Sequence, residues 1–377
     1  MISPSTLAAN LGSSTRPTVH LAVGRFSPGI GGPYQTVTAY RHILQQYQDT
    51  RLIAIRDEEK LHQVDAEKDT YLPGGWWGWL KLLAHSWRVR SDDAVVFGIW
   101  HHVFFGVALV RLATGARRSG RRTLVPTQSL SRWDWAKHRR IKALLRPIVG
   151  VALRQFDLVI FATEGERETS VPQLAEHKTI VIHHPIEPVD RAVLRRATLD
   201  GPRVAFVGRL VAQKDLGLFL STVALLPETW SADIVGWGDE RYQALLLRDA
   251  ERLGCSNRIR WHGRLSRPEA HSIIAGADAL LVTSHAENYS HTAIEAMALS
   301  VPVVMVDRVA AATDVRRNET GIVTAANPRS LAEAVMNLQE AAGTSRQALL
   351  ARAAEFARAR ESGADTDRLL KAVTGRP

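Results

Sequence analysis

Two successive series of short apolar segments constrain the fold of this 377-residue chain more than any other feature. The first series lies at residues 19–23, 52–55, 94–97, 158–161 and 179–182, and the second at 203–207, 232–235, 259–261, 279–282 and 301–304. Short buried strands that alternate with helix-length spacers predict parallel sheets with right-handed crossovers. A chain of this length also exceeds one compact core. We therefore predict an α/β protein of two doubly wound domains that face a central cleft, with ligands at the carboxyl ends of the strands.

Composition sets the expected limits of these domains. Pro185, Pro188 and the charged run that ends at Asp200 mark a linker between the two series. The expected parts are a disordered Ser/Thr-rich leader at 1–16, an N-terminal domain at 17–186, the linker at 187–200, a C-terminal domain at 201–355 and a C-terminal helix at 356–377 that packs back toward the N-terminal domain.

A lone cysteine and the absence of targeting segments indicate the compartment. Cys255 alone excludes a disulfide framework and a cysteine-based zinc site, which favours a reducing cytosol. The N-terminal residues lack the charged start and apolar core of a signal peptide. Because no apolar run reaches about 18 residues, no membrane-spanning helix is expected. We predict a cytoplasmic protein.

The formal charge of +10 is concentrated between residues 111 and 146, where Asp134 is the only acidic residue. Tryptophans and leucines interleave with these bases, as in surfaces that contact anionic lipid headgroups. The candidate membrane- or acceptor-contacting residues are Arg132, Trp133, Lys137, Arg139 and Arg140. A solvated basic face explains the pattern equally well. Nucleic acid is not the expected partner, because no zinc-finger, KH or RRM signature accompanies the charge.

A tryptophan-rich segment at residues 74–80 precedes this basic stretch. Exposed indoles there would stack on acceptor sugars or enter a lipid interface. Packing in the core is the competing interpretation, and the sequence leaves both open.

Two glutamates, Glu287 and Glu295, bracket an expected strand-to-helix turn after the apolar run at 279–282. Ser290 and Thr292 are suitable helix caps, so free backbone N–H groups would lie between the two carboxylates. A helix N-terminus attracts phosphate, and a carboxylate accepts hydrogen bonds from sugar hydroxyls; both halves of a nucleotide-sugar fit. The alternative is structural, since the helix dipole alone favours a glutamate near the first turn.

Other loops that follow strands carry phosphate-binding chemistry. Arg209 and Lys214 share one loop, and two such cations can clamp a diphosphate, although solvated surface cations would look the same. Gly31 and Gly32 follow the first strand and would let backbone amides approach a phosphate, or simply form a tight turn. Glycines after two later strands, Gly238 and Gly263, would likewise bring backbone close to a ligand.

Together these motifs resemble retaining GT-B glycosyltransferases of family GT4. The resemblance rests on Gly208-Arg209-Leu210 with Lys214-Asp215, on Gly236-x-Gly238, on His262-Gly263-Arg264, and on Glu287 with Glu295-Ala296-Met297. It is specific across about 200–310, and weaker at Gly31-Gly32. Residues 97–100 and 126–133 are similar to members that build bacterial exopolysaccharides. The resemblance implies two Rossmann-like domains, a C-terminal half that binds a nucleotide-sugar and an N-terminal half that receives the acceptor.

Residue roles follow from the same resemblance. Arg209 and Lys214 would neutralise the leaving diphosphate, Glu295 would hold the ribose hydroxyls, and Glu287 would lie beside the donor sugar. Amides near Ser290, His291 and Thr292 would contact the sugar or the phosphates, and Gly32 would donate an amide from across the cleft. The chain also departs from the family. Phe97 and Thr127 stand where relatives often have polar residues or histidine, and Ser290 and Ser300 replace common glycines.

Relatives often have a polar residue or histidine at the positions that Phe97 and Thr127 occupy here, and the adjacent His101 and His102 are candidates to supply the missing imidazole. His102 is the residue we nominate as catalytic. Either histidine could instead be a partly buried polar residue without a function.

The function that the resemblance implies is sugar transfer from a nucleotide-diphosphate sugar to a saccharide acceptor, lipid-linked and destined for a cell-surface polysaccharide. The leaving phosphate oxygen could itself take the acceptor proton on the same face, which implies retention. No DxD carboxylate pair stands at the end of an expected strand, so we expect no metal and no cofactor besides the co-substrate. The location would be peripheral, on the inner face of the plasma membrane. The alternatives are a sugar-nucleotide epimerase of similar architecture and a non-enzymatic polyanion-binding protein.

Overall fold

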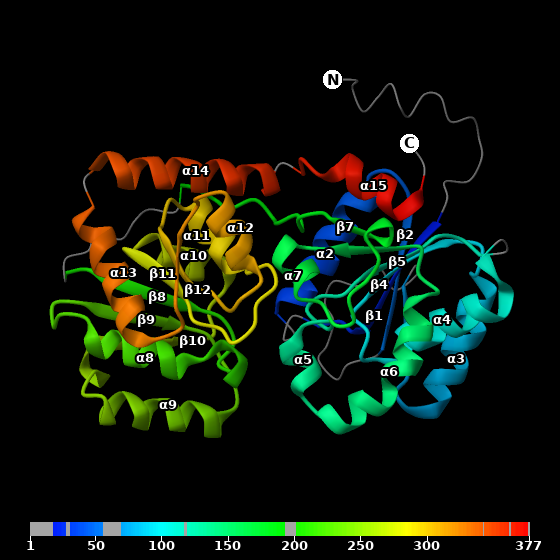
Figure 1. The fold of residues 1–377 in the computed structure, drawn as a ribbon, viewed down its shortest axis with the longest axis horizontal. Coiled ribbons are helices and arrows are strands. Elements are labelled where there is room, and N and C mark those ends of the chain that lie inside the picture. The colour runs from blue at the N-terminus through cyan, green and yellow to red at the C-terminus, as the bar shows by residue number, and fades with distance from the viewer. Residues whose placement is uncertain are drawn as a thin grey trace.

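The computed structural model describes residues 18–27, 31–55, 69–116, 119–192, 201–341, 343–361 and 363–375. These residues form two parallel sheets, each covered by helices on both faces, which lie side by side (Figure 1). The predicted fold class, two Rossmann-like doubly wound domains, is confirmed. The expected leader at 1–16 and most of the expected linker lie outside the described residues.

The N-terminal sheet has seven strands in the order β3-β2-β1-β4-β5-β6-β7. Its strands are β1 (Thr18–Arg25), β2 (Asp49–Ile55), β3 (Thr70–Leu72), β4 (Asp93–Phe97), β5 (Arg122–Val125), β6 (Leu158–Phe161) and β7 (Thr179–Val181). Neighbouring strands pair in parallel; Val23 of β1, for example, is in register with Phe97 of β4. Helices shield both faces, which is why these strands appear in the sequence as nearly continuous apolar runs.

Two sets of helices cover the N-terminal sheet on opposite faces. The helices of this half are α2 (Gly32–Gln45), α3 (Gly75–Arg88), α4 (His102–Thr114), α5 (Arg132–Ala136), α6 (Arg139–Leu153) and α7 (Glu164–Glu168). Leu82 of α3, Phe104 of α4 and Leu153 of α6 share one core with the sheet. Tyr40 of α2 belongs to a separate core on the other face.

The C-terminal sheet has six strands in the order β10-β9-β8-β11-β12-β13. They are β8 (Arg203–Val207), β9 (Ser231–Val235), β10 (Ile259–Gly263), β11 (Ala279–Val282), β12 (Val303–Val306) and β13 (Ile322–Thr324). The surrounding helices are α8 (Leu216–Leu225), α9 (Glu240–Arg252), α10 (Arg267–Ala275), α11 (His291–Ala298), α12 (Ala311–Arg317), α13 (Pro328–Glu340) and α14 (Gly343–Glu361). One continuous core fills this domain.

The chain passes between the two domains twice. The first passage is the segment after β7, where the Tyr289 hydroxyl of the C-terminal domain donates a hydrogen bond to the carbonyl of His184. The second is α14, which continues through residue 356 and so crosses the expected domain boundary. The chain then enters α15 (Thr366–Thr374), whose Leu369 and Val373 belong to the core of the N-terminal domain. Figure 1 shows α15 lying over the N-terminal sheet.

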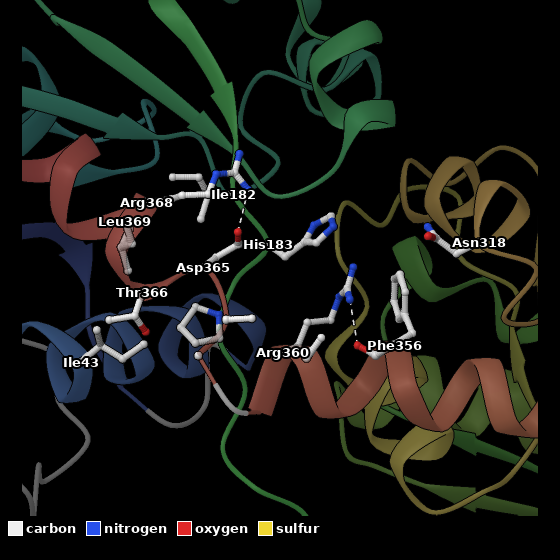
Figure 2. A pocket seen from close by; sticks show the side chains of 14 residues that line it. Ile43, Ile182, His183, Asn318, Phe356, Arg360, Asp365, Thr366, Arg368 and Leu369 are labelled. Atoms are coloured by element: carbon white, nitrogen blue, oxygen red, sulfur yellow. Dashed lines mark hydrogen bonds and ion pairs between the residues drawn. The ribbon is translucent and has the colours of Figure 1, made fainter. Parts of the chain in front are cut away.

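A cavity of about 310 Å³ lies where these two passages meet (Figure 2). His183, Phe356, Arg360, Asp365 and Arg368 are among its lining residues. The Arg360 guanidinium lies over the Phe356 ring, 3.2 Å from its centroid, and Arg368 Nη1 donates to Asp365 Oδ1 at 2.6 Å. None of the residues that the sequence nominates for a site lines this cavity. It lies beside the two segments that connect the domains.

Candidate active site

The carboxyl ends of both sheets meet at the junction of the domains. Thr36 Oγ1 of α2 lies 3.2 Å from His291 Nε2 of α11. The loops after β5 and β8 also meet, where Gln213 Nε2 donates to Gln128 Oε1 at 2.8 Å. A third contact joins Thr163 Oγ1 to the carbonyl of Asn288 at 2.9 Å. The cleft that the sequence predicts therefore lies between loops that follow strands, as expected for doubly wound folds.

The turn between β11 and α11 forms the centre of this cleft. Ser290 is the N-cap of α11 and has a left-handed backbone, with φ of 58°. A non-glycine residue in that conformation is uncommon and often marks a functional turn. Among the described residues, no acceptor takes the backbone N–H groups of His291 and Thr292. These free donors and the positive end of the helix dipole make an anion site.

Lys214 and Glu287 are brought into direct contact. The Lys214 ammonium forms an ion pair with the Glu287 carboxylate, which Ser284 Oγ also approaches at 3.4 Å. Thr283 Oγ1 donates to the Lys214 carbonyl at 3.0 Å and so ties the loop after β8 to the end of β11. The pair is charge-balanced without a ligand. An arriving anion would draw the ammonium away from the carboxylate, which could then accept hydrogen bonds from hydroxyl groups.

Arg209 is the unpaired cation of the cleft. Its guanidinium makes no hydrogen bond or ion pair with any residue that the structure describes. Its Nε lies 3.5 Å from the position that a Cβ on Gly31 would occupy, and Gly31 has φ of +74°, a conformation that favours glycine. Next to it, Gly32 begins α2, and a Cβ there would lie 3.8 Å from the His291 ring. The start of α2 therefore faces both Arg209 and the start of α11.

Glu295 lies one turn inside α11 and is buried. Its Oε1 is 3.1 Å from Arg267 Nε and 3.5 Å from His271 Nε2, while Arg267 also pairs with Glu187 beyond β7. Burial acts to raise the pKa of the Glu295 carboxyl, but hydrogen bonding and charge from His271 and the charge of Arg267 outweigh it, so the pKa is lowered. The carboxylate is ionised at neutral pH, and its Oε2 has no hydrogen bond with the described residues.

Gly238 and Gly263 have different surroundings. A Cβ on Gly238 would lie 2.0 Å from the carbonyl oxygen of Leu210, so close packing of the loops after β8 and β9 already requires glycine there. Gly263 ends β10 with φ of +66° and faces open space. The glycine at 238 thus has a structural explanation, and the backbone at 263 is open to a ligand.

The two adjacent histidines point to different parts of the N-terminal domain. His102 begins α4, and its ring lies 6.4 Å from that of Trp79 in α3, within the helix layer. His101 is the N-cap of α4 and lies among the strand ends, since a Cβ on Gly24 would be 3.0 Å and one on Gly98 3.5 Å from its ring. The structure thus places His101, rather than the nominated His102, at the carboxyl ends of β1 and β4.

Hydrogen bonds fix the protonation of His101. Its Nε2 donates to the Phe97 carbonyl at 2.7 Å, and its Nδ1 accepts from the Phe104 amide at 3.3 Å. Burial lowers the pKa of His101 to about 4, so the imidazole is neutral at physiological pH. Burial likewise lowers the pKa of His291 to about 4. Neither ring adds positive charge to the cleft, and Lys214 and Arg209 supply its cations.

Glu166 is a buried cleft residue that the sequence analysis missed. It accepts hydrogen bonds from the backbone N–H groups of Gln128 and Ala162 at 3.0 and 2.9 Å, and from Asn288 Nδ2 at 3.1 Å. It thereby holds the left-handed residues Thr127 and Gln128 against the opposite domain. The pattern Thr163-x-x-Glu166 predicts the start of a helix. It does not predict that Glu166 contacts Gln128 and Asn288, which are distant in the sequence.

One nominated residue of the basic segment contacts the other domain. Trp133 was expected at a membrane or acceptor surface, but its ring stacks on that of His285 in the C-terminal domain, with centroids 4.7 Å apart and an interplanar angle of 13°. The half-buried Trp133 indole thus lies between the two domains. The other nominated residues of the segment, Arg132, Lys137, Arg139 and Arg140, are exposed.

Comparisons with known proteins agree with this geometry. Residues 201–341 match the family model of "Glycosyl transferases group 1". D-inositol 3-phosphate glycosyltransferase of Mycobacterium leprae is 32% identical over 163 residues, which cover 39% of this chain and 37% of that protein. The sequence similarity thus spans little more than a third of the relative's length.

Solved structures match nearly the whole chain. The HepE protein of Anabaena in complex with UDP and glucose superposes with a TM-score of 0.76 at 17% identity, over 96% of this chain and 100% of that one. Sucrose-phosphate synthase of Thermosynechococcus elongatus gives 0.73 at 17% identity, over 95% and 100%. Such identities show the fold alone, which is the GT-B arrangement of two facing Rossmann-like domains.

Two further features of the described residues bear on ligands and membranes. No group of three or more His, Cys, Asp or Glu side chains is placed there to hold a metal ion. No helix in the described ranges is both long and apolar enough to cross a bilayer.

Proposed function

We propose that this protein is a retaining glycosyltransferase that moves a sugar from a nucleotide-diphosphate sugar to a saccharide acceptor. The observation that carries the proposal is the cleft itself, where Arg209 and Lys214 lie with the free N–H groups at the start of α11. Phosphate is the ligand that such an arrangement binds best. The family match over residues 201–341 and the UDP complex of the structurally similar HepE support a nucleotide-sugar donor.

Each half of the donor has residues of suitable chemistry. Arg209, Lys214 and the amides of Gly32, His291 and Thr292 would hold the diphosphate, and Glu295 would accept hydrogen bonds from the ribose through its free Oε2. Glu287 would bind sugar hydroxyls once the diphosphate has drawn Lys214 away. The backbone around Gly263 would contact the base.

The same arrangement would lower the barrier to transfer. Negative charge builds on the departing diphosphate as the glycosidic bond breaks, and cations and helix amides already in place stabilise it without reorganisation. A leaving phosphate oxygen would take the acceptor proton on the face from which it departs, which gives retention. Neutral His101, at the ends of β1 and β4, would border the acceptor side of the cleft, with both ring nitrogens bonded to backbone groups.

We further propose a lipid-linked saccharide acceptor, a role in cell-surface polysaccharide assembly and a peripheral position on the inner face of the plasma membrane. The basic N-terminal half supports this proposal, since it would hold a polyanionic lipid carrier near the cleft. We also propose that the reaction needs no metal, because two side-chain cations and two helix N-termini face the leaving group.

Ligand stabilisation tests the donor assignment directly. A ligand that binds only the folded protein raises its melting temperature, so nucleoside diphosphates and nucleotide-sugars, UDP-glucose among them, are screened by thermal shift. We expect nucleoside diphosphates to stabilise the protein and the corresponding nucleosides to have no effect. The Arg209→Ala variant should reduce the shift. No shift with any nucleoside diphosphate would overturn the proposal.

A second measurement separates transferase from epimerase. The nucleotide-sugar that stabilises the protein is incubated with and without a membrane extract as the acceptor source. A transferase releases nucleoside diphosphate in step with incorporation of the sugar into the extract. Conversion of the nucleotide-sugar itself without acceptor would favour the epimerase.

A further inference from the structure

The outer helices of the N-terminal domain expose most of the large apolar side chains that are exposed in the described residues. They come from α3, α4 and α6, which cover one face of the N-terminal sheet (Figure 1). The side chains are Trp76, Trp77, Leu80 and Trp87 on α3, Leu109 and Leu112 on α4, and Ile141, Leu144, Ile148 and Val151 on α6. Apolar residues that gather on one face mark an interaction surface, whereas scattered ones need no explanation.

Helix α6 is apolar on two sides. Val149, Ala152 and Leu153 face the core, as a surface helix requires. Ile141, Leu144, Ile148 and Val151 recur at intervals of three and four residues, so they form a second stripe, which points to solvent. Leu144 is 78% exposed. Packing among the described residues does not account for the second stripe.

The stripe borders an apolar groove between α4 and α6. The groove has a volume of about 420 Å³, and Trp79, Leu109, Leu112, Ile148 and Val151 are among its lining residues. Gln155 is the one lining residue with a polar functional group other than the Trp79 indole. An elongated hydrocarbon chain matches such a lining, whereas a sugar or a nucleotide would leave its polar groups unpaired.

The positive charge of these helices indicates which kind of partner would cover this face. No acidic residue occurs in α3, α4 or α6. Exposed cations accompany the apolar stripe: Lys81 and Arg88 on α3, and Arg139, Arg140, Arg146 and Arg154 on or next to α6. Lys142 is not among them, because its ammonium is buried and pairs with Asp134 at 2.8 Å. A second copy docked on the same face would bring like charges together, whereas anionic lipid headgroups would neutralise them.

The tryptophans at the start of α3 favour the same occupant. The rings of Trp76 and Trp77 contact each other, tilted by 30° with centroids 4.2 Å apart, and each side chain is at least 60% exposed. Indoles with an apolar body and a polar N–H are typical of the interface between lipid chains and headgroups.

We propose that α3, α4 and α6 form a membrane-docking face that inserts among anionic bilayer lipids, and that the α4–α6 groove takes a lipid acyl chain. This proposal adds a membrane-contacting surface to the proposed function. It rests on that function in one respect, because the docked protein would meet a lipid-linked acceptor at the membrane. Helix α5 connects the face to the cleft, because Trp133 in α5 stacks on His285 and α6 begins three residues after α5 ends. A docked protein would therefore present its cleft close to the headgroups.

Co-sedimentation with vesicles tests the face. The full chain is mixed with phosphatidylcholine vesicles that contain or lack phosphatidylglycerol, at low and high salt. We expect binding to the anionic vesicles, weakened by salt. The double variant Leu144→Glu with Ile148→Glu should lower the fraction bound at least about tenfold, because two charges would enter the lipid interface. The matched control is Leu245→Glu with Leu247→Glu on α9, exposed leucines of the other domain, which should bind like the unchanged protein.

The other outcomes are decisive. Equal binding by both double variants, or no binding by the unchanged protein, would overturn the docking face. A dimer that the α6 variant alone dissociates on size exclusion would show that a second copy covers the face instead. Thermal shift with nucleoside diphosphate on the same variants reports the donor site independently. A normal shift without vesicle binding therefore rejects the docking face alone, and vesicle binding without a shift rejects the donor assignment alone.

Discussion

The two walls of the cleft use different chemistry. The C-terminal wall carries charged groups on short loops: Arg209, Lys214, Glu287 and, one helical turn deeper, Glu295. The N-terminal wall presents glycine backbone at the start of α2 and a neutral imidazole at His101. The first wall suits a ligand of fixed charge, and the second is set by shape and main-chain hydrogen bonding. The difference teaches that charged side chains define one wall, whereas backbone shape defines the other.

Removal of the Lys214 ammonium from the C-terminal wall should have the largest effect on turnover. We expect Lys214→Ala to lower turnover by about 10²–10³-fold, because it deletes a cation that would meet the charge on the leaving group. Steady-state kinetics with the donor found by thermal shift measure the loss, and circular dichroism checks the fold. The control is Arg252→Ala, an exposed cation on α9, which should leave turnover unchanged. Near-normal turnover of Lys214→Ala would show that the charged side chains of the C-terminal wall are not required for transfer.

Loss of the stacking contact between the walls should have a moderate effect. Trp133→Ala and His285→Ala each remove the stacked pair, and such pairs are worth about 0.5–1.5 kcal/mol. We expect each variant to lower kcat/KM by roughly 2–12-fold, and the double variant to lose little more than either one. Kinetics of the four proteins form the double-mutant cycle. Additive losses would show that the stacking does not couple the walls.

Metal removal should have the smallest effect. If side-chain cations and helix ends balance the diphosphate charge, EDTA followed by Mg²⁺ or Mn²⁺ should change the initial rate by less than about twofold. The Arg209→Ala variant makes the test sharper, since a metal that substitutes for the missing cation would restore some of its activity. A large recovery of the unchanged enzyme on adding metal would show that the charged wall is incomplete without it.

The sequence predicts the fold and the charged wall for a physical reason. Strands buried on both faces are apolar along their whole length, so their number and their order along the chain can be recognised in the sequence. Charged residues in loops after such strands necessarily reach the same edge of a sheet, which is why Arg209, Lys214 and Glu287 could be nominated together. The short distance in sequence between each of these residues and the preceding strand is enough to predict that they lie at this edge.

The neutral wall could not be predicted in the same way. His101 and His102 are adjacent, and which of them faces the strand ends depends on the helix start, a boundary that sequence patterns place poorly. Trp133 reads as an amphipathic anchor beside its basic neighbours, but its partner His285 lies in the other domain. Glu166 likewise acts through Gln128 and Asn288, distant in the chain. Contacts of this kind depend on how the domains pack.

The return of α15 to the first domain has a consequence for biosynthesis. Leu369, Ala372 and Val373 fill the core beneath the N-terminal sheet, and Arg121 Nε donates to the Ala372 carbonyl at 2.7 Å. Of these two domains, the N-terminal one leaves the ribosome first, but its core is complete only after α15, which follows the whole C-terminal domain in the chain. A nascent chain therefore holds an unfinished N-terminal domain while the C-terminal domain folds, and the emergence of α15 is the step that closes the structure.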